Sequence, residues 1–257
     1  MKVKPQNSPR KIRSLRTLLT KTVFFHVYAF HKNFAFRKRA FFGQFGEDNF
    51  LEKLLPEING TYVDIGAGWP VIGSNSYKFY KKGWSGILVD PITANFQLLK
   101  LFRRRDDVLQ ALVGNTIGEI DFYEIHPYVF STTKEEYALK AVAERNARLK
   151  RVTRLKVVAL RDICPQLVPE QASFLSIDVE GGDLSVLESN NWSFTRPRVI
   201  CVEEWDNEIQ DGHSLVKTFL EDRGYVLFDR VGLSSFFVEN EYFKKYSRCL
   251  MTENLEV

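Results

Sequence analysis

Apolar runs and amphipathic stripes alternate along the chain from Phe42 onward. Tyr62–Ile65 and Ile87–Val89 have the pattern of short buried strands, and Asn75–Lys82 between them has the pattern of a helix that ends near Gly83. This exchange of strand and helix signals, without repeats or a low-complexity linker, predicts an α/β domain with a doubly wound, mostly parallel sheet. Further strands are predicted at Val108–Val113, Gly118–Ile125, Leu155–Ala159, Phe174–Val179, Val199–Glu203, Tyr225–Phe228 and Phe236–Val238.

Two further segments are defined by their patterns. The apolar stripe within Phe96–Phe102 predicts a second helix, with Thr93 as its N-terminal cap. Ser131–Arg154 is polar, highly charged and helix-prone, which is typical of an insertion that covers a site. We therefore predict a substrate lid at residues 126–154.

The N-terminal region differs from the rest in charge. Its first 46 residues contain eleven Lys and Arg side chains and no Asp or Glu, although the net charge of the whole chain is only +4. Phe and Leu side chains lie between these cations, a mixture that favours an amphipathic helix on an anionic membrane surface. We predict a basic helical arm at residues 1–41 and a catalytic domain at 42–257. An arm packed on its own domain or on a partner subunit is the alternative.

Composition narrows the class of protein. With 257 residues and 44% hydrophobic content, the chain can fill the core of a single α/β domain. Its three cysteines have neither metal-ligand spacing nor an even count, which favours a reducing compartment. No uninterrupted apolar stretch has the length of a membrane span or a signal peptide core. We expect a cytoplasmic protein, held at the inner face of the membrane through the arm. Nucleic acid is a disfavoured partner, because the domain after the arm is acidic and has no reader motif.

The segment Asp64-Ile-Gly-Ala-Gly68 joins the first predicted strand to a glycine turn. The next strand ends at Asp90, where a carboxylate can accept hydrogen bonds from both hydroxyls of a ribose. A nicotinamide site is disfavoured, because Val71 replaces the third glycine of its fingerprint and Pro70 obstructs an immediate helix start. S-adenosylmethionine carries no phosphate, so a glycine turn without an open helix N-terminus suits it better than a dinucleotide. We predict an adenosyl cofactor.

A second group of carboxylates follows the strand predicted at Phe174–Val179. If that strand extends through Glu180, its period of two places Asp178 and Glu180 on one face, at the edge where ligands gather in an open sheet. Either carboxylate is a candidate catalytic base. Together with Glu203 they are also candidate ligands for a divalent cation such as Mg²⁺. Asp183 is expected to cap the next helix. His126 is a weaker candidate base.

Several motifs in order resemble those of the FkbM-family methyltransferases, over roughly residues 42 to 240. The resemblance implies the class I S-adenosylmethionine-dependent methyltransferase fold, with a seven-stranded sheet whose last strand is antiparallel. It also implies O-methylation, often of sugars in glycans or natural products. The motifs are Gly43-Gln44-Phe45-Gly46-Glu47-Asp48, Asp64-Ile-Gly-Ala-Gly68, Ser74-Asn75-Ser76, Gly83-Trp84-Ser-Gly86, Asp90-Pro91 and Leu175-Ser-Ile-Asp178-Val-Glu180-Gly181.

The resemblance also assigns roles to single residues. Asp90 would bind the ribose of the cofactor, and it stands where the family often has Glu. The loop Trp69–Gly73 departs from the family's usual continuation of the glycine turn, and Ser76 replaces a common Thr. The residues implied for the cofactor site are Gln44, Glu47, Asp64, Gly66, Gly68, Ser74, Asn75 and Asp90.

The leading hypothesis is an S-adenosylmethionine-dependent O-methyltransferase that acts on a sugar hydroxyl of a surface polysaccharide or glycolipid precursor. One alternative is a non-catalytic cofactor-binding or scaffolding module. Another is a ribose methyltransferase that uses the basic arm to contact nucleic-acid phosphates.

Overall fold

The computed structural model describes residues 39–116, 118–164, 167–204, 209–210 and 213–253. The chain divides into two compact units, Met1–Ala40 and Phe41–Val257. Nearly all of the predicted arm at residues 1–41 lies outside the described residues, and every described helix and strand belongs to the second unit.

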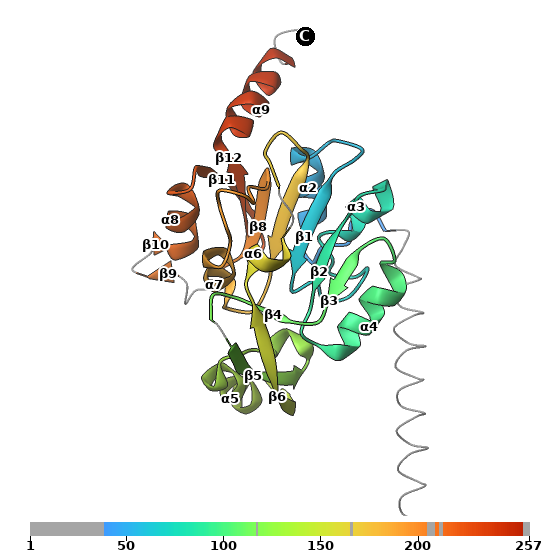
Figure 1. Ribbon diagram of the computed structural model, residues 1–257, viewed down its shortest axis with the longest axis vertical. Coiled ribbons are helices and arrows are strands. Elements are labelled where there is room, and N and C mark those ends of the chain that lie inside the picture. The colour runs from blue at the N-terminus through green and yellow to red at the C-terminus, as the bar shows by residue number, and fades with distance from the viewer. Residues whose placement is uncertain (1–38, 117, 165–166, 205–208, 211–212, 254–257) are drawn as a thin grey trace, which may run out of the picture. The chain divides into compact units, whose positions relative to one another are not determined.

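A seven-stranded sheet forms the centre of the second unit (Figure 1). Its strand order is β11-β12-β8-β7-β1-β2-β3. The last strand, β12, is antiparallel to both of its neighbours, and the other four neighbouring pairs are parallel. The predicted doubly wound, mostly parallel sheet is confirmed. The strands are β1 Thr61–Ile65, β2 Ser85–Val89, β3 Asp107–Leu109, β7 Ser173–Ile177, β8 Val199–Glu203, β11 Tyr225–Val231 and β12 Ser234–Glu239.

Helices cover both faces of this sheet, and alternate residues of each strand face opposite cores. In β1, Val63 and Ile65 pack in one core with residues of α6, α7 and α8, whereas Tyr62 packs in the other with residues of α2, α3 and α4. Alternation of apolar side chains to both sides is what a buried parallel sheet requires. The helices are α2 Glu47–Leu54, α3 Tyr77–Lys82, α4 Thr93–Phe102, α6 Leu160–Ile163, α7 Asp183–Glu188, α8 Leu215–Glu221 and α9 Asn240–Glu253.

A second, three-stranded sheet of order β4-β6-β5 is inserted between β3 and β7. We call residues 112–158 the lobe; it lies at the bottom of Figure 1. Ala138 and Ala141 of its helix α5 pack on Ile125 in a small separate core. The lobe is therefore a folded unit with its own sheet and core. Its elements are β4 Leu112–Val113, β5 Gly118–His126, the 3-10 turn η1 Tyr128–Phe130, α5 Glu135–Glu144 and β6 Arg148–Val158. A small ladder of β9 Ile209–Gln210 and β10 His213–Ser214 lies elsewhere.

The structure corrects several boundaries. The strand predicted at Val108–Val113 is two strands, because β3 belongs to the main sheet and β4 to the lobe. The strand predicted at Leu155–Ala159 begins earlier, at Arg148, so residues 148–154 of the predicted helical lid are strand. Pairing with β5 overrides the polar composition of this segment. The predicted cap Thr93 is the first residue of α4, and Ile92 holds the cap position.

The helix α3 ends where the sequence indicates. Gly83 adopts a left-handed conformation (φ 109°), and its backbone N–H donates to the carbonyl oxygen of Tyr80 at 3.1 Å.

Within the described residues, no helix combines the length and apolarity needed to cross a membrane.

Candidate active site

The carboxyl ends of three neighbouring strands meet at one edge of the main sheet. Ile65 of β1 is in register with Val89 of β2 on one side and with Ile177 of β7 on the other. The loops after these strands therefore begin side by side, and each carries residues that the sequence singled out. In an open α/β sheet this edge is the usual place for a ligand.

The glycine turn after β1 packs directly on the residue that follows β7. A Cβ atom on Gly66 would lie 1.7 Å from the backbone oxygen of Asp178, and Gly66 has a φ of 79°. Only glycine meets both requirements. Gly68 also has a positive φ, and its backbone N–H donates to Oδ2 of Asp90 at 2.9 Å. The turn is thus fastened to the ends of both adjacent strands.

Asp90 lies at the end of β2 and organises the start of α4. Its carboxylate also accepts from the backbone N–H of Ile92 at 2.8 Å and from Nδ2 of Asn95 at 3.1 Å. Burial raises the pKa of Asp90 to about 7, against the lowering effect of these donors. Asn95 is buried, and its Oδ1 is an acceptor with no hydrogen-bond partner among the described residues. Sequence reasoning missed Asn95, since nothing in the pattern separates it from other polar positions of the helix.

Three carboxylates gather on the neighbouring side of the site. Asp178, Glu180 and Glu203 each place one oxygen so that all three lie within 4.8 Å of one another. Desolvation beside the neighbouring loops, then the charges of Glu203 and Glu180, raise the pKa of Asp178 well above its usual range, although its side chain remains exposed to solvent in the cavity. Desolvation and the charges of Glu203 and Asp183 raise the pKa of Glu180 to about 9. The raised pKa values keep Asp178 and Glu180 protonated at neutral pH. We call Asp178, Glu180 and Glu203 the acidic cluster.

Asp178 and Glu180 lie close together, as the sequence predicted. The predicted cause, alternation along a strand that extends through Glu180, is wrong. Strand β7 ends at Ile177, so Glu180 does not belong to a strand that extends past Asp178. Glu180 instead has a left-handed backbone (φ 57°), which turns the chain back. The carboxylate of Asp183 holds this loop by accepting from the backbone N–H groups of Val179 and Gly181. Asp183 is itself the first residue of α7, and Gly182 is the cap.

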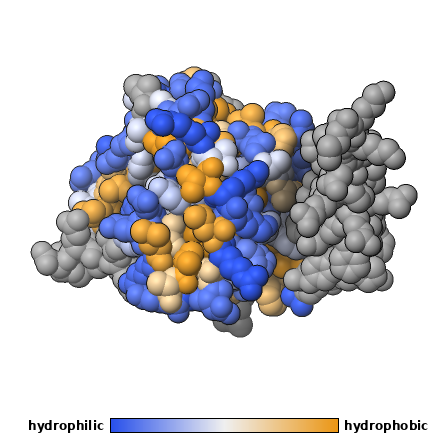
Figure 2. Space-filling view, turned by 90° about the horizontal axis from the view of Figure 1, so that it is seen from below, coloured by the Kyte–Doolittle hydropathy of each residue, from blue (hydrophilic) through white to orange (hydrophobic). Residues whose placement is uncertain are grey.

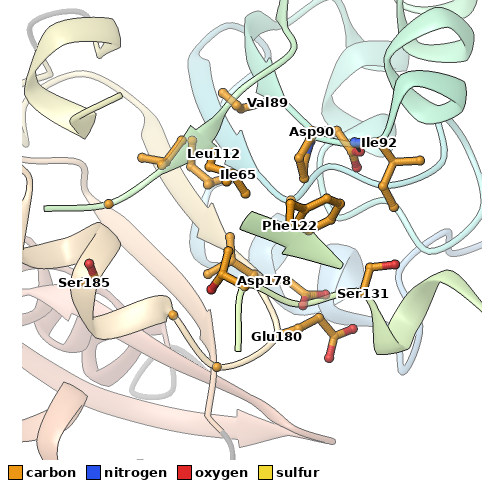
Figure 3. Close-up of a pocket in the computed structure, with 18 of the residues that line it drawn as sticks. Ile65, Val89, Asp90, Ile92, Leu112, Phe122, Ser131, Asp178, Glu180 and Ser185 are labelled. Carbon is orange, nitrogen blue, oxygen red and sulfur yellow. Dashed lines mark hydrogen bonds between the residues drawn. The ribbon is translucent and has the colours of Figure 1, made fainter. Parts of the chain in front are cut away.

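A cavity of about 650 Å³ joins Asp90 to the acidic cluster (Figure 3). Its wall near Asp90 is apolar, with Ile92 from the main sheet side and Phe122 from the lobe. Asp178 and Glu180 lie together in the view, with Ser131 of the lobe nearby. A cavity of this size, mostly apolar with a few convergent polar groups, is typical of a site for a small molecule or cofactor.

The predicted site residues divide into two groups. Gln44, Gly66, Gly68, Asp90, Asp178 and Glu180 line the cavity. Glu47, Asp64, Ser74 and Asn75 are not among its lining residues, and nor is His126, which is exposed at the end of β5. Glu203 reaches the site through the acidic cluster.

The residues outside the cavity support it from behind. Asp64 is buried and accepts from Oγ of Ser76 at 2.6 Å, and its pKa is raised by that burial. Ser76 in turn accepts from Arg103, which also donates to Ser74. Asn75 donates from Nδ2 to Oγ of Ser176 at 3.2 Å. The carboxylate of Glu47 accepts from the backbone N–H of Phe45.

Comparison with known proteins agrees with the architecture. Seven strands with an antiparallel last strand and a glycine turn after β1 define the class I methyltransferase fold. The family model described as "Methyltransferase FkbM domain" matches residues 64–227. The chain belongs to the FkbM methyltransferase family. No curated protein matches it.

Solved structures that the chain is similar to include two methyltransferases. One is precorrin-6y C5,15-methyltransferase from Geobacter metallireducens GS-15, with 13% identity, a TM-score of 0.38, and coverage of 80% of this chain and 93% of that one. The other is 1,6-didemethyltoxoflavin-N1-methyltransferase from Burkholderia thailandensis, in a structure with bound S-adenosylhomocysteine. It has 13% identity, a TM-score of 0.33, and coverage of 92% of this chain and 91% of that one.

Proposed function

We propose that the protein is an S-adenosylmethionine-dependent O-methyltransferase that acts on a sugar hydroxyl. One observation carries the proposal. The cavity has a carboxylate suited to a ribose, Asp90, at one end and candidate proton acceptors, Asp178 and Glu180, at the other. An alcohol is a poor nucleophile until a base removes its proton, and the acidic cluster supplies candidate bases. A non-catalytic binding module would have no use for this second group of carboxylates.

The cavity suits S-adenosylmethionine. Asp90 would accept from the ribose hydroxyls, and the unpartnered Oδ1 of Asn95 offers one more acceptor beside it. Ile92 and Phe122 would pack against the adenine. When bound, this cofactor supplies an activated methyl group on a sulfonium.

The chain's own residues would orient the acceptor and remove its proton. Asp178 or Glu180 would take the hydroxyl proton as the oxygen attacks, and the cavity walls would hold the oxygen in line with the methyl group. The raised pKa values of both carboxyls suit proton acceptance at mildly alkaline pH. A Mg²⁺ ion held by the acidic cluster is the alternative way to activate the same hydroxyl.

Mass spectrometry would test the reaction class. The protein is incubated with S-adenosylmethionine and a panel of sugar nucleotides, glycans and short RNAs. The proposal expects a mass increase of one methyl group on a sugar. Methylation of RNA alone would support the ribose methyltransferase instead, and no methylation despite cofactor binding would support a non-catalytic module.

Asp90→Asn is expected to weaken S-adenosylmethionine binding roughly 10-fold to 150-fold. The change removes a charged acceptor, and hydrogen bonds to charged groups contribute about 1.5 to 3 kcal/mol. Isothermal calorimetry measures the affinity. The exposed Asp107→Asn on β3 is the matched control and should bind as the parent does. Unchanged affinity in Asp90→Asn, or tight NAD binding by the parent, would remove the cofactor assignment.

We also propose that the basic arm at residues 1–41 holds the enzyme at the inner face of an anionic membrane. Deletion of residues 1–40 should leave the fold intact, because all seven main-sheet strands lie in the unit Phe41–Val257. Sedimentation with anionic vesicles should fall on deletion, and binding of the parent should fall as salt rises. Neutral vesicles are the control. If the truncated protein becomes insoluble, the arm packs on its own domain or on a subunit.

A further inference from the structure

The lobe contributes one wall of the cavity. Tyr128, Val129, Thr133 and Lys134 line it, and all four follow strand β5 in the chain. The opposite wall comes from the loops after the main-sheet strands, which carry the cofactor candidates and the acidic cluster. A molecule held between these walls would have its reacting end at the acidic cluster and its other end against the lobe.

The charge of the lobe is opposite to that of the acidic cluster. Strand β6 contains five Lys and Arg residues and no Asp or Glu. Lys150 directs its Nζ toward the cavity-lining Tyr128, 2.6 Å from the hydroxyl and 4.4 Å from the ring centroid. Arg151 donates from Nη2 to Oγ1 of Thr93 at 3.1 Å, beside the lining residue Ile92. Two cations of β6 thus reach the rim of the cavity.

These cations are only partly neutralised. Glu124 is the carboxylate that Lys150 and Arg151 share, at 3.9 Å and 2.6 Å. Lys150 is 42% exposed and Arg151 51%, so both keep donors for a ligand. Lys134 forms no ion pair with any described residue. Glu124 therefore leaves part of the positive charge of Lys150 and Arg151 available to a ligand.

We propose that Lys134, Lys150 and Arg151 bind an anionic group of the acceptor, a phosphate or diphosphate attached to the sugar. The proposal rests on the function proposed above and names its substrate class. A phosphate or diphosphate presents several negatively charged oxygens, and lysine and arginine are the side chains that bind phosphate oxygens. The anion belongs to the acceptor, because S-adenosylmethionine has no phosphate and its nucleoside end is assigned to Asp90.

Two sources can supply this chemistry, a sugar nucleotide or a lipid-linked sugar diphosphate. Five of the twelve large hydrophobic residues that the described chain exposes lie within residues 129–152 of the lobe. Figure 2 views the molecule from the lobe's end and shows hydrophobic residues grouped among hydrophilic ones on this face. The five are Val129, Leu139, Val142, Leu149 and Val152. They offer contacts for a lipid chain that a nucleotide would not need.

The kinetic experiment uses matched acceptors and the full chain. Nucleoside diphosphate hexoses are each paired with the methyl glycoside of the same hexose. We expect kcat/KM to be at least about 10-fold higher for the phosphorylated member. Lys150→Met and Arg151→Met should raise its KM about 10-fold, leave kcat within a few-fold, and leave the glycosides unaffected. Lys140→Met, an exposed lysine of α5 that does not line the cavity, is the matched control and should behave as the parent does.

A second arm distinguishes the two sources. A farnesyl diphosphate hexose is compared with the nucleotide-linked form of the same hexose. If the lipid-linked form is the better acceptor, Leu139→Gln and Val142→Gln should lower kcat/KM for that form alone. If the nucleotide-linked form is better, both variants should have no effect. Either result supports a phosphate-bearing acceptor.

Binding of pyrophosphate tests the rim without any methylation. Calorimetry with sodium pyrophosphate and EDTA should show saturable binding to the parent, weakened about 10-fold by Lys150→Met. Equal kcat/KM for phosphorylated and unphosphorylated acceptors, or pyrophosphate binding unchanged in both β6 variants, would overturn the proposal. If no sugar is methylated, the proposed function fails, and pyrophosphate binding alone then decides whether the rim is an anion site.

Discussion

Asp178→Asn and Glu180→Gln are expected to separate binding from chemistry. The variant that removes the base should lower turnover by about 100-fold or more, and both should bind S-adenosylmethionine within a few-fold of the parent. Single-turnover rates and calorimetry measure the two quantities. Glu188→Gln is the matched control, because Glu188 lines the same cavity outside the acidic cluster. Parental rates in both cluster variants would make these carboxylates structural and shift attention to Glu203.

The pH dependence identifies which carboxyl acts. With the pKa of Asp178 raised, and that of Glu180 raised to about 9, these two carboxyls hold protons at neutral pH. The base must lose its proton first, so kcat/KM should rise with pH above neutrality, and should level off above about 9 if Glu180 is the base. Glu180→Gln removes a negative neighbour of Asp178. If Asp178 is the base, its pKa should fall and the rising limb should move to lower pH.

The same kinetics distinguish a direct base from a metal ion. Treatment with EDTA should leave the rate unchanged if a carboxylate takes the proton alone. If the acidic cluster holds Mg²⁺, EDTA should abolish activity in the parent and added Mg²⁺ should restore it.

Arg103→Met is expected to destabilise the fold by about 3 to 5 kcal/mol. The side chain of Arg103 is fully buried, and its Nε donates to Asp106 at 2.8 Å, where the partner carboxylate is also fully buried. The guanidinium further donates to the hydroxyl of Tyr62, to the carbonyl oxygen of Pro70 and to Ser76. Removal leaves the buried carboxylate of Asp106 without its cationic partner, which costs much more than the pair itself contributes.

Urea unfolding measures this loss. The neighbouring, exposed Arg104→Met is the control and should be nearly neutral. The double variant Arg103→Met with Asp106→Asn should recover part of the loss, because it removes the uncompensated charge. If Arg103→Met unfolds at the parental urea concentration, the buried network does not stabilise the site.

Prediction from sequence succeeded where the signal is local. The turn Gly66-Ala-Gly68 and the carboxylate of Asp90 each follow a short buried strand. These two strands are neighbours both in the chain and in the sheet, and their parallel pairing brings the two strand ends together. The acidic cluster was found for an incorrect reason, because the left-handed backbone at Glu180 is set by the loop to Asp183 rather than by strand alternation.

Features built from distant residues were missed. Arg103 lies in a run of charged residues that looks like a solvated surface, and its partners Tyr62, Pro70 and Ser76 are 27 to 41 positions away in the chain. Strand β6 was mistaken in part for a helical lid, since its Arg and Lys side chains are exposed and only pairing with β5 fixes it as a strand.

The insertion of the lobe between β3 and β7 has an evolutionary consequence. The chain leaves the main sheet once and returns once, and between these crossings it completes its own sheet and core. Under the proposed function, substitutions there would alter the wall of the cavity that faces the acceptor and would leave the strand ends at the glycine turn and Asp90 in place. We therefore expect relatives with different acceptors to differ most in this segment, and we expect a chimera carrying another relative's residues 112–158 to take that relative's acceptor while keeping the same methyl donor.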